Sequence, residues 1–357
     1  MIVCYSMNNL VSGNWLSLQI TSHQSFFYLF SAGAFFPASL LHQVFNMINS
    51  IVKYLDYFFV LRPTLFFPVW TVYLANYHAH SCFDNSNPQL ISASNPFIVG
   101  LLLTLLMGSA FIINQLKDIL TDRKNQKLFI IADGYIQKKN AILETIILGI
   151  LAVVLAFYLN TKLGIAFICV FFTTGILYNI EPFVWKDKPL LGIVANFLGG
   201  ITVAAAGWIT AGTDNWKFLL HACPYGIGLV AVYFLTTLAD IKGDVDANKQ
   251  TFGVKYGFKL STYFAIICEI ITIIFSYMLK DYMLFIPAVV SLPLFLIAVV
   301  TQNLEHVLKA VKYTVLFASL AVCVKYPIYL IVLVGLFFFS RWYYRVRFNV
   351  EYPKFAA

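Results

Sequence analysis

Charged residues are scarce in this chain of 357 residues. Asp, Glu, Lys and Arg make up 11% of it, whereas 60% of the residues are hydrophobic and the mean hydropathy is +0.79. A soluble domain carries about 25% charged residues, so a soluble globular enzyme and a disordered chain are both excluded. Apolar runs of about 20 residues, long enough to cross ~30 Å of hydrocarbon, recur along the sequence. We therefore predict an all-α, polytopic membrane protein.

Closely paired cysteines are also lacking. No CxxC or similar spacing occurs, and the six histidines form no zinc-binding pattern, so neither a disulfide framework nor a thiolate metal site is indicated. The cysteines are scattered, mostly inside apolar runs, at Cys4, Cys82, Cys169, Cys223, Cys268 and Cys323.

Residues 1–52 contain no Lys, Arg, Asp or Glu. The apolar stretch near 26–45 lacks the basic segment that opens a signal peptide. From Met47 onward the pattern resembles an independent beginning of a membrane domain. We expect residues 1–46 to be a dispensable N-terminal extension, 47–345 a single transmembrane domain and 346–357 a C-terminal tail.

Hydropathy predicts nine to ten membrane helices, and we favour ten. The expected helices are 64–82, 97–117, 141–160, 162–180, 190–211, 218–239, 259–280, 283–302, 308–324 and 327–344.

Basic residues gather in alternate loops. Segment 83–96 has none, whereas segments 117–139, 181–189 and 240–259 carry several. Loops rich in Lys and Arg stay on the cytoplasmic side, so we expect a protein of the cell inner membrane with these three loops in the cytoplasm. The net charge of +8 then reflects orientation and contact with the lipid bilayer, and indicates no nucleic-acid partner.

The placement of the acidic residues is the most informative feature. Asn114, Asp118 and Asp122 are spaced by four residues, which puts them on one face of a helix. Asp240 and Asp244 repeat this spacing where another predicted helix reaches the same side of the membrane. Carboxylates at such depth are costly and are usually functional.

Two facing sets of carboxylates would suit a hard cation. Mg²⁺ prefers oxygen ligands and is commonly held by carboxylates together with substrate phosphates, and the basic residues nearby would bind a diphosphate. Ordinary solvated loop charges are one alternative. A membrane transporter or ion-conducting protein is another, although the acids concentrate at one membrane face instead of continuing through the bilayer.

At these positions the sequence resembles the UbiA-type intramembrane prenyltransferase family. That family's first motif, NxxxDxxxD, matches Asn114 to Asp122, and its second, DxxxD, matches Asp240 and Asp244. Thr251 and Gly257 follow at the family's spacing, and the resemblance covers roughly residues 50–300.

The resemblance implies that the helices bundle around a central cavity. It also implies a Mg²⁺-dependent enzyme, with two ions, that moves a polyprenyl group from a polyprenyl diphosphate to a hydrophobic or amphiphilic acceptor. The acceptor would be an aromatic ring or a glycerol-phosphate ether. The implied metal ligands are Asn114, Asp118, Asp122, Asp240 and Asp244, and the four aspartates are the implied catalytic residues. The implied substrate-binding residues are Asn114, Lys127, Tyr178, Lys186 (or its neighbour Lys188) and Lys249.

Overall fold

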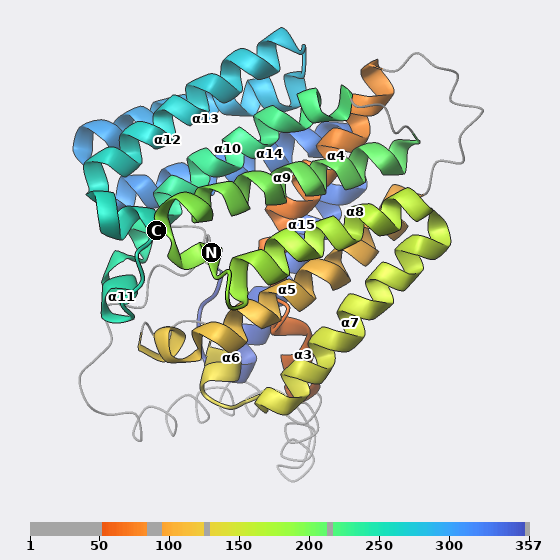
Figure 1. Ribbon diagram of the computed structural model, residues 1–357, viewed down its shortest axis with the longest axis vertical. Coiled ribbons are helices and arrows are strands. Elements are labelled where there is room, and N and C mark those ends of the chain that lie inside the picture. Colours follow the sequence, from red (N-terminus) through yellow and green to blue (C-terminus); the bar gives the residue numbers. More distant parts are fainter. Residues whose placement is uncertain (1–51, 84–94, 125–128, 213–216, 354–357) are drawn as a thin grey trace, which may run out of the picture.

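The computed structural model describes residues 52–83, 95–124, 129–212 and 217–353. Every regular element in this part of the chain is helical, so the predicted all-α fold is confirmed (Figure 1). The ends expected to form the extension 1–46 and the last residues of the tail lie outside the described residues.

Ten helices, nine of them 18 residues or longer, account for the apolar runs in the described residues. They are α4 (Phe66–Phe83), α5 (Pro96–Lys124), α7 (Lys138–Leu159), α8 (Thr161–Phe171), α9 (Pro189–Ala211), α10 (Lys217–Ala239), α12 (Phe252–Met278), α13 (Tyr282–Thr301), α14 (Leu304–Lys325) and α15 (Pro327–Phe348). The short elements are α3 (Asp56–Phe59), η1 (Pro63–Leu65), α6 (Phe129–Ala132), a π-helical segment η2 (Phe172–Leu177), η3 (Trp185–Asp187) and α11 (Ile241–Asp246).

The number of membrane spans agrees with the prediction of nine to ten. In the described ranges, nine helices are long and apolar enough to cross a membrane. The tenth expected helix corresponds to α8 continued by η2, Thr161–Leu177, which is apolar but shorter. The chain therefore has the helices of an integral membrane protein.

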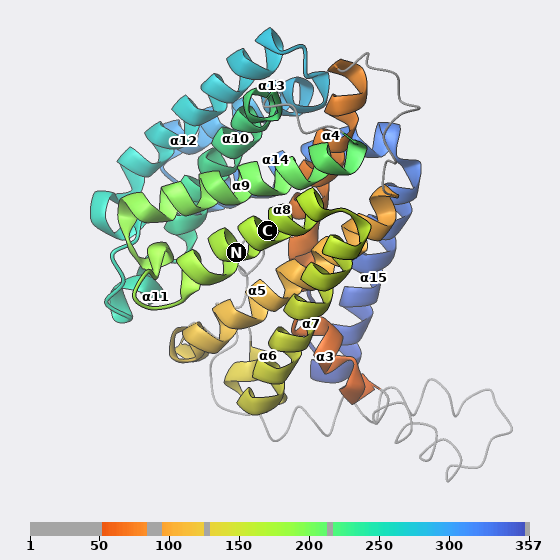
Figure 2. The same cartoon turned by 45° about the vertical axis from the view of Figure 1, so that its right-hand side comes forward.

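Successive helices pack side by side from α7 to α14, α5 packs against α7, and α14 returns to α4 (Figures 1 and 2). Within this ring, α4 also lies along α9. A Cβ at Gly207 of α9 would collide with the backbone of Tyr73 and Tyr77, so a residue without a side chain lets the two helices approach closely. The α4–α9 contact separates two halves of the bundle.

A cavity of about 70 Å³ lies in the half formed by α4, α10, α12, α13 and α14. Its lining includes Glu269, which is 1% exposed and whose Oε1 accepts a hydrogen bond of 2.7 Å from Ser291. The aspartate motifs belong to other elements, so this cavity is separate from them.

Helix α12 begins earlier than the predicted residue 259. Gly257 has φ +75° within it, a conformation that glycine adopts without strain, and it bends α12 just after the first turns. The turns before Gly257 run from Phe252 and carry the chain from the end of α11 into the membrane-spanning part.

The C-terminal helix α15 is fastened to α3 by a buried ion pair. Asp56 is 2% exposed, and its Oδ1 accepts hydrogen bonds from the Tyr343 hydroxyl at 2.6 Å and from Arg347 Nε at 3.1 Å. Its Oδ2 accepts from Arg347 Nη2 at 3.0 Å. The Tyr343 ring stacks on Phe59 with the ring centres 3.6 Å apart.

We predict that Asp56→Asn lowers the free energy of unfolding by about 2 kcal/mol, because it leaves the half-buried Arg347 without its counter-ion. Thermal denaturation in detergent would measure this as a fall in Tm of several degrees. Glu351→Gln is the control, because its pairing with Arg341, at 3.8 Å, is exposed and should contribute under about 0.5 kcal/mol. Equal Tm values for the two variants would contradict the role given to Asp56.

Candidate functional site

The two aspartate motifs come together at one end of the bundle. The last turns of α5 carry the first motif, and α11, which carries the second, contacts α5 directly. Both views show α11 beside the C-terminal end of α5 (Figures 1 and 2). The convergence expected from the sequence is therefore present.

The first motif forms one buried face of α5. Asn114, Asp118 and Asp122 are each at most 9% exposed. Asn114 Nδ2 donates a hydrogen bond of 2.8 Å to Asn179 Oδ1, on the turn that follows η2. Asp122 Oδ2 is buried and has no hydrogen-bond partner in the described part of the protein. A buried carboxylate oxygen without a hydrogen-bond partner is unfavourable unless a cation compensates for it.

Asp118 is held by two lysines from distant segments. Lys186 Nζ lies 2.7 Å from Asp118 Oδ2, and Lys249 Nζ lies 2.9 Å from Asp118 Oδ1. Lys186 is in η3 and is 4% exposed, whereas Lys249 follows α11. Both carboxylate oxygens thus face an ammonium group, and the expected basic residues Lys186 and Lys249 lie within the site.

Backbone hydrogen bonds tie the two lysine-bearing segments to each other. The amide of Gln250 donates to the carbonyl oxygen of Asp187 at 3.1 Å, and the amide of Lys249 donates to that of Asp244 at 2.9 Å. Lys249 Nζ also lies 3.7 Å from Asp187 Oδ1. Three parts of the chain therefore form one polar cluster around Asp118.

The second motif is less buried at its first residue. Asp240 precedes the first turn of α11 and is half-buried, whereas Asp244 is 8% exposed and its Oδ2 accepts a hydrogen bond of 3.0 Å from Thr251. Burial, aided by the charge of Asp240, raises the pKa of Asp244 to about 6. Its ionised form therefore gains from any cation placed beside it.

The site shifts the pKa values of the two lysines in opposite directions. Burial lowers the pKa of Lys186, and Asp118 only partly counteracts that effect. Burial also disfavours the charge of Lys249, but Asp118 and Asp187 outweigh it and raise its pKa. In both cases the acidic partners favour the charged form of the lysine.

The oxygen donors suit Mg²⁺ in type, but they do not form a ready-made metal cluster. Among the described residues, no three His, Cys, Asp or Glu side chains lie close enough to hold an ion together. Like charges repel when no cation lies between them, and Asp118 already has two ammonium partners. Ligation by Asn114, Asp118, Asp122, Asp240 and Asp244 therefore stays a prediction, supported by the unpartnered oxygen of Asp122.

Tyr178 lies one residue beyond η2, and its side chain hydrogen-bonds to that of Asn196 on α9. Asn196 in turn donates to the carbonyl oxygen of Gly192 at 2.8 Å. Lys188, the alternative to Lys186, is exposed and has no place in the cluster, and Lys127 lies outside the described residues.

Sequence reasoning did not single out Asp187, Asn179 or Asn196 as site residues. Asp187 stands between Lys186 and Lys188, and Asn179 follows Tyr178, so each adjoins a residue that was selected. Their position next to predicted site residues is the one sequence signal for Asp187 and Asn179. The fold is needed to show that these two side chains, and that of Asn196, lie at the site.

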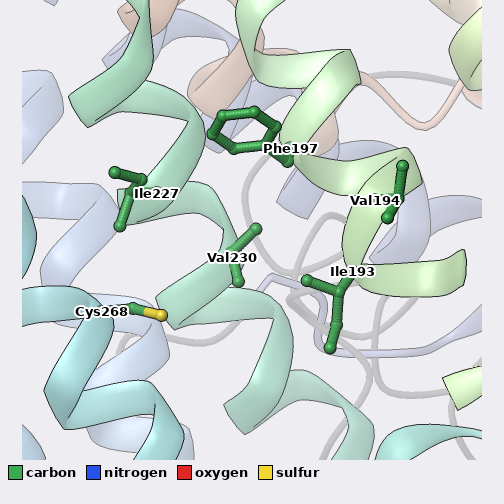
Figure 3. A pocket seen from close by; sticks show the side chains of 6 residues that line it. All are labelled: Ile193, Val194, Phe197, Ile227, Val230 and Cys268. Atoms are coloured by element: carbon green, nitrogen blue, oxygen red, sulfur yellow. The ribbon is translucent and has the colours of Figure 1, made fainter. Parts of the chain in front are cut away.

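An apolar pocket of about 210 Å³ begins one turn along α9 (Figure 3). Its lining can accommodate hydrocarbon and offers no charged side chain. The lining residues are Ile193, Val194 and Phe197 of α9, Ile227 and Val230 of α10, and Cys268 of α12.

Comparison with known proteins identifies the family. Residues 64–306, more than half of the chain, match the UbiA prenyltransferase family. The chain belongs to this family. The resemblance found in the two aspartate motifs is thus confirmed, and the transporter alternative is set aside in favour of family membership.

Two curated members of the family illustrate its range. A digeranylgeranylglyceryl phosphate synthase from Methanosphaera stadtmanae is 30% identical over 179 residues, 50% of this chain and 64% of that protein. A chloroplastic 2-acylphloroglucinol 4-prenyltransferase from Humulus lupulus is 29% identical over 188 residues, 48% of this chain and 45% of that protein. The chain thus matches roughly half to two thirds of each relative's length.

Solved family structures share the fold. A UbiA homologue from Archaeoglobus fulgidus has a TM-score of 0.59 at 18% identity, covering 79% of this chain and 99% of that one. The same homologue bound to GPP and Mg²⁺ has a TM-score of 0.58 at 19% identity, covering 76% and 99%.

We predict that Thr251→Val weakens Mn²⁺ binding in the presence of inorganic pyrophosphate about tenfold, because residues that orient a metal ligand typically affect affinity by 10–100-fold. The substitution keeps the side-chain shape and removes only the hydroxyl that donates to Asp244. Thr301→Val, at the exposed end of α13, is the control and should bind Mn²⁺ like the wild type. Unchanged affinity in Thr251→Val would show that this hydrogen bond does not position Asp244.

Proposed function

We propose that this protein transfers a polyprenyl group from a polyprenyl diphosphate to a hydrophobic or amphiphilic acceptor, in a Mg²⁺-dependent reaction that releases diphosphate. The observation that carries the proposal is the meeting of both aspartate motifs with the buried Lys186 and the half-buried Lys249 at one end of a membrane bundle. Family membership and the names of the curated relatives support it.

The site offers cationic side chains for the diphosphate of the donor and oxygen ligands for the Mg²⁺ that accompanies it. Lys186 and Lys249 have the charge to pair with diphosphate oxygens, and Lys127 is a further candidate from the sequence. Asn114, Asp118, Asp122, Asp240 and Asp244 would hold Mg²⁺, with two ions proposed. When bound, Mg²⁺ supplies positive charge where the leaving diphosphate becomes more negative.

In the proposed reaction the allylic carbon–oxygen bond of the donor breaks and its electron pair leaves with the diphosphate. The acceptor forms a new bond to that carbon and loses a proton. The carbon has cationic character in between, so it needs aromatic neighbours and exclusion of water. We propose Tyr178, whose side chain hydrogen-bonds to that of Asn196 on α9, for this contact.

The apolar part of both substrates explains the membrane setting. A polyprenyl chain is as apolar as the lipid around the bundle, and spaces between helices, such as the pocket in Figure 3, can take hydrocarbon. The relatives' names specify a glyceryl phosphate product in one case and an acylphloroglucinol substrate in the other. We propose an acceptor from one of these two classes, a glycerol-phosphate ether or an aromatic ring.

We further propose that residues 47–345 form one domain in the cell inner membrane, with the aspartate-bearing end in the cytoplasm. The basic residues of the loops around 117–139, 181–189 and 240–259 support this orientation.

We predict that Asp118→Asn and Asp240→Asn each reduce turnover by about 100-fold or more, because each removes a negative charge needed to hold the Mg²⁺ that stabilises the leaving diphosphate. Proteoliposomes given labelled geranylgeranyl diphosphate, Mg²⁺ and a panel of acceptors would be assayed for diphosphate release. The panel would include hydroxybenzoate, dihydroxynaphthoate and geranylgeranylglyceryl phosphate.

Asp246→Asn is the matched control, since Asp246 lies in the same helix α11 as Asp244 but is exposed. It should retain wild-type turnover, and chelation of Mg²⁺ should abolish turnover in every variant. Full activity in Asp118→Asn, or activity after chelation, would contradict the proposed function.

A further inference from the structure

Both oxygens of Asp118 are already engaged by ammonium groups, Lys186 at 2.7 Å and Lys249 at 2.9 Å. Lys186 is 4% exposed, and among the described residues Asp118 is the carboxylate that lies within salt-bridge distance of it. Lys249 has a second, longer contact of 3.7 Å to Asp187. These pairs compensate the charges of four buried or half-buried groups at once.

A divalent cation and the two lysines compete for the same carboxylate. Mg²⁺ binds carboxylate oxygens at about 2.0–2.1 Å and requires near-octahedral geometry. An ion at that distance would share a carboxylate oxygen of Asp118 with an ammonium group, because each of the two oxygens already has one within 3 Å. Like charges at such separations repel strongly in a buried site, so the lysines must move before Asp118 can bind a metal.

The lysines cannot simply leave Asp118. Removing one partner from a buried ion pair leaves an uncompensated charge, which is strongly unfavourable. They need another anion, and a diphosphate provides several oxygens with negative charge. Lysine suits this exchange because its ammonium group is a compact charge on a flexible four-carbon stem.

We propose that Lys186 and Lys249 form a lysine latch on Asp118, which excludes a divalent cation until a diphosphate draws the lysines onto its own oxygens. This inference rests on the proposed function, of which it describes the regulation. The exchange frees Asp118 for the cation, beside the unpartnered Oδ2 of Asp122. Cation and diphosphate therefore bind cooperatively, and each binds weakly alone.

If the lysines only bound phosphate, removing one would not change Mn²⁺ affinity in the absence of diphosphate. The latch predicts that it does. Lys249→Met and Lys186→Met should bind Mn²⁺ in the absence of diphosphate at least tenfold more tightly than the wild type. In the wild type, inorganic pyrophosphate should increase Mn²⁺ affinity at least tenfold, and both variants should show a smaller increase. Mn²⁺ serves as the probe because it shares the preference of Mg²⁺ for carboxylate oxygens.

The test uses the full-length protein in lipid nanodiscs, with free Mn²⁺ measured by electron paramagnetic resonance. Lys188→Met and Lys242→Met are the controls, because both lysines are exposed and lie next to η3 and within α11. They should match the wild type with and without pyrophosphate. Wild-type Mn²⁺ affinity that is independent of pyrophosphate, or lysine variants that bind Mn²⁺ no more tightly, would overturn the latch.

A second variant covers the case in which a methionine variant does not fold. Asp118→Asn releases both lysines, so it should bind inorganic pyrophosphate without metal at least tenfold more tightly than the wild type. Equal or weaker metal-free binding would overturn the latch. These are binding measurements, so cooperative binding of Mn²⁺ and pyrophosphate without prenyl transfer would contradict the proposed function and leave the latch standing.

Discussion

The pairing of Asp118 with Lys186 and Lys249 is the interaction on which the polar end of this bundle depends. It joins the end of α5, the η3 segment and the chain after α11, which are separated by 68 and 131 residues from Asp118. A buried carboxylate would be unfavourable in a membrane protein without such partners, and buried lysines would be equally unfavourable. Charge compensation therefore brings the three segments together and places both aspartate motifs at one mouth of the bundle.

The membrane imposes the rest of the arrangement. Polar groups within the spans have few partners available, so they pair across helices, as Asn114 does with Asn179 and Glu269 with Ser291. The same requirement fastens α15 through Asp56 and Arg347. Apolar side chains need no such partners. They can therefore face lipid, or line spaces between helices that accept hydrocarbon chains, such as the pocket between α9, α10 and α12.

Much of this organisation could be predicted from the sequence, because long apolar runs and four-residue spacing are local signals. The ten apolar helices and the shared face of Asn114, Asp118 and Asp122 appear in the structure at their expected places. Family membership, reached from the two aspartate motifs, is confirmed as well.

What could not be predicted depends on contacts between distant residues. The sequence pointed to Lys186 and Lys249 as phosphate partners, but their engagement with Asp118 needs the fold to bring the end of α5, the η3 segment and the chain after α11 together. The ion pair between Asp56 and Arg347 spans 291 residues and leaves no periodic signal. The early start of α12 was also missed, because the turns before Gly257 are less apolar than the span that follows.

The central claim is that the two aspartate motifs act together on a metal-bound diphosphate. A crystal of the full-length protein grown with Mn²⁺ and inorganic pyrophosphate, measured at the manganese absorption edge, tests it most directly. The account predicts anomalous density between the end of α5 and α11, with pyrophosphate oxygens beside Lys186 and Lys249. Anomalous density at a place that touches neither aspartate motif would contradict it.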